Sequence, residues 1–105
     1  MVDHLVLFRF RSDLPDGAVA ALFNELRALA GEIAGISGFR GGAYRSTEGL
    51  AKGFSHGFVM TFRSEAERDA YLPHPAHQRV VAKLVPMLEG GLEGALAFDF
   101  IDGAI

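Results

Sequence analysis

Two segments of the 105-residue chain repeat one pattern, and this repeat limits the possible folds more than any other feature. The stretches "HLVLFRFRS" (4–12) and "HGFVMTFRS" (56–64) carry His, Phe, Arg and Ser at the same offsets. Both stretches alternate in polarity and are rich in aromatic and β-branched residues, which is typical of β-strands. The repeat predicts a chain built from two similar halves.

Each repeated strand is followed by a helical pattern. The first helix is predicted from about Asp16 to Ile33, and the second begins at Ser64, where Glu67 has the spacing of a capping box. The stretches "GISGFRGGAYRS" and "GALAFDFI" come after these helices and read as two further strands. The apolar stripe of the first helix consists of Leu22, Phe23, Leu26, Leu29, Ala30 and Ile33.

The order strand-helix-strand, repeated twice, predicts an α+β fold. The most economical arrangement is a ferredoxin-like, four-stranded antiparallel sheet of order 4-1-3-2 with both helices on one face. The stretch "STEGLAKGF" joins the halves, and nothing in it resembles a flexible linker between domains. Residues 1–105 are therefore interpreted as a single domain.

The first strand is apolar on both of its faces. His4, Val6 and Phe8 point to one side, whereas Leu5 and Leu7 point to the other. Two helices can cover only one face, so the second face needs a further cover, and a copy of the same sheet is the simplest one. We expect a homodimer whose sheets pack face to face into an α+β barrel. The alternative is a monomer that tolerates a few exposed leucines.

Composition excludes several classes of function. The net charge is −3 without a basic cluster, which argues against a nucleic-acid partner. The absence of cysteine excludes disulfides and thiolate chemistry. The N-terminal stretch "MVDHLVLFRFRS" lacks the form of a signal peptide or a membrane span, so we expect a cytoplasmic protein with no membrane partner.

The stretch "AYLPHPAHQRVV" (70–81) contains two prolines that interrupt a helix. Each proline removes a backbone donor and restrains the residue before it. The second helix should therefore end near Tyr71 or Leu72, and a new helix should begin at Pro75 with His74 as its cap. The new helix should end at Pro86.

His77 then lies in the first turn of the new helix. The helix macrodipole is positive there and disfavours a charged imidazole, so His77 should stay neutral near pH 7, as a general base must. Tyr71, across the proline corner, could donate a hydrogen bond to a substrate carbonyl or to this imidazole. The alternative is that the prolines only turn the chain and the histidines face water.

His4 and His56 begin the two repeated strands on a face with aromatic neighbours. The antiparallel topology brings His4 close to the middle of the second crossover and leaves His56 nearer the opposite end. For His56, a histidine bonded to nearby backbone is as good an interpretation as a pocket residue. We expect an apolar pocket between helices and sheet, in which the histidines are joined by Val6, Phe8, Phe23, Leu26 and Phe58.

No metal or other cofactor is expected. His74 and His77 are the only histidines at ligand spacing on one element, and no carboxylate is clearly grouped with them. Asp99 and Asp102, on the last strand, are interpreted as isolated, so no paired-carboxylate site is expected.

Four stretches together resemble the stress-responsive A/B barrel (Dabb) family: "HLVLFRF", "EGLAKGFSHGFVMTF", "YLPHPAHQRVV" and "AFDF". The resemblance covers nearly the whole chain, and Y-x-x-H-P-x-H is its most specific element. It implies a ferredoxin-like protomer and a dimeric α+β barrel. The polyketide cyclase chemistry known in this family implies His77 as general base, Tyr71 as its support, and His4 and His56 as pocket residues. A pocket tyrosine of such a cyclase is replaced here by Leu26.

Two hypotheses from different classes follow from these observations. The first is a homodimer that binds a small carbonyl-containing or aromatic molecule in its apolar pocket, with cofactor-free acid–base chemistry of the cyclase or lyase type. The second is a non-catalytic stress-response or assembly protein of the same fold, whose histidines only satisfy the core. A heme- or oxygen-dependent enzyme rests on fold analogy alone.

Overall fold

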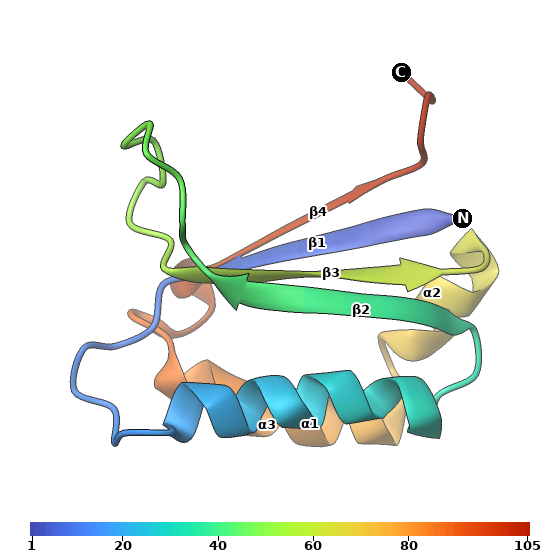
Figure 1. Ribbon diagram of the computed structural model, residues 1–105. Coiled ribbons are helices and arrows are strands. Elements are labelled where there is room, and N and C mark those ends of the chain that lie inside the picture. Colours follow the sequence, from blue (N-terminus) through green and yellow to red (C-terminus); the bar gives the residue numbers. More distant parts are fainter.

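A computed structural model describes residues 1–105 as one sheet with a helical layer against one of its faces (Figure 1). All strand pairs are antiparallel, in the order β2-β3-β1-β4, which is the predicted order read from the other edge. The predicted ferredoxin-like topology is therefore confirmed. The strands are β1 (Val2–Phe8), β2 (Ile36–Ala43), β3 (His56–Phe62) and β4 (Ala95–Phe100).

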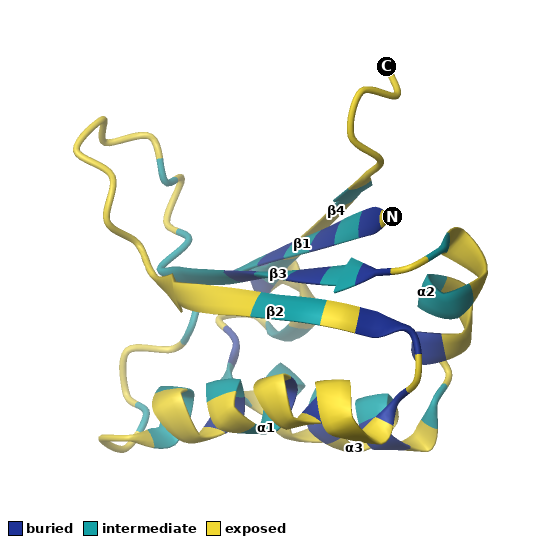
Figure 2. Ribbon diagram, turned by 45° about the vertical axis from the view of Figure 1, so that its right-hand side comes forward, coloured by how far each residue is buried: buried dark blue, intermediate teal, exposed yellow.

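Helices α1 and α3 lie side by side under the sheet, and α2 lies at the end of the sheet near the N-terminus (Figure 1). The opposite face of the sheet carries no helix, and the β2–β3 loop and the C-terminal tail rise on that side (Figures 1 and 2). No helix combines the length and the apolar character needed to cross a membrane. The helical segments are α1 (Ala18–Glu32), α2 (Glu65–Tyr71), α3 (Pro75–Leu84) and the short 3-10 turns η1 (Val85–Met87) and η2 (Gly91–Gly94).

The core lies between the sheet and the helices α1 and α3. Every second residue of β1, from Val2 to Phe8, is buried on the helix side, as the alternating sequence pattern requires. The stripe of α1 covers these residues through Leu22, Leu26 and Leu29, each at most 3% exposed. The sequence pattern is therefore sufficient to orient both elements toward the core.

The first strand differs from its predicted extent of 4–12. It begins at Val2 and ends at Phe8, and Phe10 keeps only an isolated bridge to Leu88. The reason is the lack of partners, because both neighbouring strands begin opposite Phe8, β3 at His56 and β4 at Ala95. Helix α1 also begins later than predicted, after Gly17, whose φ of 83° is left-handed.

The proline corner has the predicted form. Helix α2 ends at Tyr71, α3 begins at Pro75, and the Nδ1 atom of His74 accepts a hydrogen bond from the backbone N–H of Ala76 at 3.0 Å. The predicted capping box of α2 is only half formed, because Ser64 accepts from the N–H of Glu67.

Candidate functional site

A cavity of about 70 Å³ lies between the sheet and the helices α1 and α3. Seven of the nine site residues predicted from the sequence line it, and they come from five different elements. Two valines and a leucine of α3 complete its wall. The lining residues are His4, Val6, Phe8, Leu26, Phe58, Tyr71, His77, Val80, Val81 and Leu84.

His77 is held by the carbonyl group that the proline corner leaves without a helical partner. Its Nδ1 atom lies 2.7 Å from the backbone oxygen of Leu72. A carbonyl oxygen can only accept a hydrogen bond, so Nδ1 carries the proton and the neutral ring has its lone pair on Nε2. The fold therefore selects the tautomer in which Nε2 is the basic atom.

The pKa of His77 lies below 6.5, and burial is the main cause. The hydrogen bond to Leu72 acts in the opposite direction, while the nearby His4 and His74 lower the pKa further. The sequence predicts the same direction of shift from the helix macrodipole, whereas burial is its largest cause in the structure. A half-buried, neutral imidazole at neutral pH is the protonation state that a general base needs.

Tyr71 is only 1% exposed, and its ring lies 4.2 Å from that of His77 between centroids. Burial raises the pKa of its phenol well above the ordinary value of 10.0, so the hydroxyl keeps its proton. None of the side-chain hydrogen bonds within the protein uses this hydroxyl. Tyr71 can therefore act as a donor toward a molecule in the cavity.

His4 takes part in a chain of contacts that the sequence analysis missed. Its Nδ1 atom lies 2.6 Å from Oδ1 of Asp99, and Oδ2 of the same carboxylate lies 2.5 Å from Arg68. Interpreting Asp99 as isolated was therefore wrong. The cause is strand register, because β1 and β4 place His4 directly opposite Asp99 although the two are far apart in sequence. The predicted sheet order was a usable signal, since it already placed the last strand beside the first.

Asp99 is ionised in this arrangement. Burial acts to raise its pKa, but the hydrogen bonds and charges of His4 and Arg68 outweigh burial and bring the pKa below 3.8. An ionised carboxylate only accepts hydrogen bonds, so the Nδ1 atom of His4 must donate. His4 and His77 thus both carry a proton on Nδ1.

His56 and Phe23 do not line this cavity. The Nδ1 atom of His56 lies 2.9 Å from the hydroxyl of Ser55, and the imidazole packs against the rings of Phe10 and Phe23. Burial lowers the pKa of His56. These residues therefore form a separate cluster around the first residue of β3.

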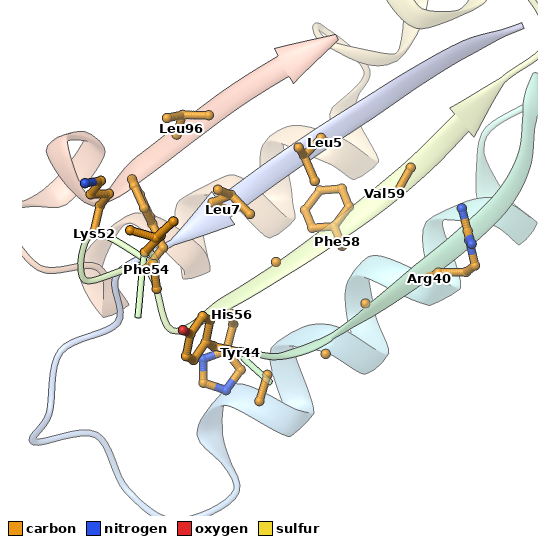
Figure 3. Close-up of a pocket in the computed structure, with 16 residues that line it drawn as sticks. Leu5, Leu7, Arg40, Tyr44, Lys52, Phe54, His56, Phe58, Val59 and Leu96 are labelled. Carbon is orange, nitrogen blue, oxygen red and sulfur yellow. The ribbon is translucent and has the colours of Figure 1, made fainter. Parts of the chain in front are cut away.

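A second, larger hollow of about 680 Å³ lies on the sheet face that no helix covers (Figure 3). Leu5, Leu7 and Leu96 rise from the strands, and Tyr44 and Phe54 border the hollow at the β2–β3 loop (Figure 3). Further along the same face Phe98 is 58% exposed. This face has the apolar character that was predicted for a surface covered by a second copy.

The model of one protein family, the Stress responsive A/B Barrel Domain, matches residues 2–102. The chain belongs to this family. Among curated Dabb relatives, DABB1 of Arabidopsis thaliana is 29% identical over 102 residues, which are 96% of this chain and 47% of that protein. At5g22580 of the same plant is 29% identical over 87 residues, 82% of this chain and 76% of that protein. The chain thus spans about half the length of DABB1.

Solved structures agree with the Dabb assignment. A dimeric ferredoxin-like protein of unknown function from Jannaschia sp. CCS1 is 33% identical, with a TM-score of 0.81 over 95% of this chain and 97% of that one. At3g17210 from Arabidopsis thaliana is 25% identical, with a TM-score of 0.90 over 100% and 98%. A hydroxynitrile lyase from Passiflora edulis is 20% identical, with a TM-score of 0.87 over 99% and 95%, and shares the fold.

Proposed function

We propose that this Dabb chain binds a small carbonyl-containing or aromatic molecule in the cavity beside His77 and catalyses cofactor-free proton transfer on it. The observation that carries the proposal is the hydrogen bond from Nδ1 of His77 to Leu72, which leaves Nε2 unprotonated in a ring that lines the cavity. The phenol of Tyr71 and the imidazole of His4 line the same space. These three groups are a base, a donor and a second imidazole.

The reaction begins when Nε2 of His77 removes a proton from a carbon next to a carbonyl group. The electron pair moves onto the carbonyl oxygen, and the hydroxyl of Tyr71 stabilises this oxygen by donating a hydrogen bond. The resulting enolate carbon forms a bond to a second carbonyl carbon, and His77 returns its proton to the new alkoxide. This sequence closes a ring in a cyclase, and its reverse cleaves a carbon–carbon bond in a lyase.

The size of the cavity restricts the substrate. Ligand pockets usually measure about 300–1,000 Å³, whereas this cavity holds about 70 Å³. The reacting carbonyl fragment of a small molecule fits such a space. A longer polyketide chain requires the wall formed by Leu26, Val81 and Leu84 to move outward.

The small cavity also favours the second candidate function, a non-catalytic stress-response or assembly protein. In that case the imidazoles only form hydrogen bonds within the folded core, and His4 contributes to the stability of the fold through its contact with Asp99. This candidate requires that no small molecule stabilises the protein through His77. The two candidates are therefore separated by one ligand experiment.

We further propose that residues 1–105 form one domain and that two copies pair through their uncovered sheet faces. Leu5, Leu7, Val59 and Leu96 line the hollow on this face. The relative from Jannaschia sp. and a 27% identical relative from Thermobifida fusca are both described as dimeric ferredoxin-like proteins. Burial of these side chains against a second copy removes a large apolar surface from water.

The first experiment is a thermal-shift screen of wild type, His77→Ala and His56→Ala with short β-keto thioesters, β-keto acids and aromatic acids. The control variant also removes an imidazole, but one outside the cavity. A ligand at 100 times its Kd stabilises a protein by about 2.7 kcal/mol, which is a shift of several degrees. We expect this shift in wild type and His56→Ala and its loss in His77→Ala. Equal shifts in all three proteins, or none in any, would contradict the proposed site.

A further inference from the structure

Arg68, on α2, is tied to the candidate site although it lies outside the cavity. One of its terminal nitrogens contacts Oδ2 of Asp99 at 2.5 Å, and its Nε contacts Asp69 at 2.9 Å. Its side chain is only 19% exposed, in contrast to the other arginines in ion pairs, Arg11 and Arg79, which are about half exposed. The two oxygens of the Asp99 carboxylate thus have different partners, Oδ2 contacting Arg68 and Oδ1 contacting His4.

The surroundings of His4 leave Asp99 as its only charged contact. Strand β3 presents the rings of Phe58 and Phe62 to His4 with centroids about 6 Å away. Helix α2 adds the ring of Tyr71 at 6.1 Å, and α3 adds the imidazole of His77 across the cavity. His74, the N-cap of α3, is the remaining titratable group that acts on His77.

We propose that Arg68 is a positioning residue for the candidate site. By holding Oδ2 of Asp99 it presents Oδ1 to the Nδ1–H of His4 and leaves Nε2 of His4 at the cavity. The inference rests on the proposed function only in that His4 belongs to a working site. The contacts themselves exist whether or not the protein is an enzyme.

Arg68 acts on His4 through the carboxylate that the two residues share. A carboxylate whose second oxygen is held by a guanidinium keeps one orientation. Without Arg68, Asp99 no longer has to present Oδ1 to Nδ1 of His4, and either nitrogen of that ring can carry the proton. The loss of Arg68 therefore changes which nitrogen of His4 is unprotonated at the cavity, although Arg68 does not line the cavity.

The test is 15N NMR of the imidazole side chains in wild type, Arg68→Gln, Arg68→Lys and Arg11→Gln. Arg11→Gln is the matched control, because it removes one positive charge and breaks an Arg–Asp ion pair in the loop after β1. The 15N shifts of the two ring nitrogens of His4 show which of them carries the proton. The 15N shifts of His77 in the same samples show whether its own tautomer changes.

In Arg68→Gln we expect the difference between the 15N shifts of Nδ1 and Nε2 of His4 to shrink, because the proton is no longer confined to Nδ1. Arg68→Lys should restore most of the wild-type spectrum because an ammonium group can still bind Oδ2 of Asp99. If Arg68→Gln does not fold, Arg68→Met keeps the aliphatic stem and is judged by the same two readouts. Spectra of Arg68→Gln that match Arg11→Gln would overturn the proposal.

The result is independent of turnover. If His4 responds as expected and no carbonyl compound binds or reacts, Arg68 positions His4 and the proposed function fails. If a compound binds through His77 and His4 does not respond to Arg68, the proposed function stands and the positioning role fails.

Discussion

At the scale of single residues, two imidazoles have their protonation sites set by acceptors that come from elsewhere in the fold. His77 donates to the carbonyl of Leu72, and His4 donates to the carboxylate of Asp99. Both rings therefore keep Nε2 for the cavity that they line. The sequence predicted His77 and Tyr71 as partners across the corner, because only the local spacing of the prolines was needed to place them.

The depressed pKa of His77 makes stability depend on pH. The folded state resists protonation of His77, while the unfolded chain takes up the proton near the ordinary value of 6.5. The contribution of His77 is therefore fully present above about pH 6.5 and is lost as pH falls from there through the folded-state pKa. We expect the free energy of unfolding, measured in urea at about pH 7.5 and about pH 5, to decline more in wild type than in His77→Gln. His56, whose pKa is also lowered, accounts for a decline that remains in the variant. An equal decline in both proteins would contradict this assignment.

At the scale of elements, the proline corner between α2 and α3 organises the candidate site. It ends α2 at Tyr71 and begins α3 at Pro75, so that Tyr71 and His77 face each other across the turn. The carbonyl of Leu72 at this corner accepts hydrogen bonds from both His77 and Gln78. The corner therefore supplies the geometry that a continuous helix would lack.

His74 stabilises this corner as the N-cap of α3, through its Nδ1 contact with the N–H of Ala76. We expect His74→Ala to lower the free energy of unfolding by about 1 kcal/mol, because an N–H at the helix start loses its acceptor. His74→Asn should recover most of this loss, since asparagine is a good N-cap. Urea unfolding of the three proteins provides the measurement, and an alanine variant as stable as wild type would show that the cap is not important.

At the scale of the whole molecule, one sheet face is covered by helices and the other is open. Leu96, Phe98 and Phe100 of β4 are between 40% and 58% exposed on the open side. Leu5 of β1 lies opposite Phe98 and extends the apolar surface toward the sheet centre. A second copy of the chain is the cover that we propose.

A charge placed in this face should prevent pairing. We expect wild type to have twice the chain mass in size-exclusion chromatography with light scattering, and Phe98→Asp to have the mass of one chain, because an unpaired buried carboxylate is costly. Leu92→Asp is the control, since Leu92 is 70% exposed in η2, outside the sheet. A wild-type protein that is monomeric, or a Phe98→Asp variant that still dimerises, would contradict the proposed interface.

The sequence by itself determined the features that depend on neighbouring residues. The alternation of the two repeated strands, the stripe of α1 and the prolines at 73 and 75 each act over a few positions, and the predicted elements and sheet order follow from them. The ends of β1 were misjudged because a strand extends only as far as its partners do, and those partners lie far along the chain.

Only the tertiary structure decided which polar groups meet. The pair of His4 and Asp99 depends on the register between the first and last strands, and a shift of one residue would turn Asp99 to the other face. Arg68 joins the pair because α2 packs at the end of the sheet. The cavity volume likewise depends on how side chains from separate elements fill one space, which no local pattern specifies.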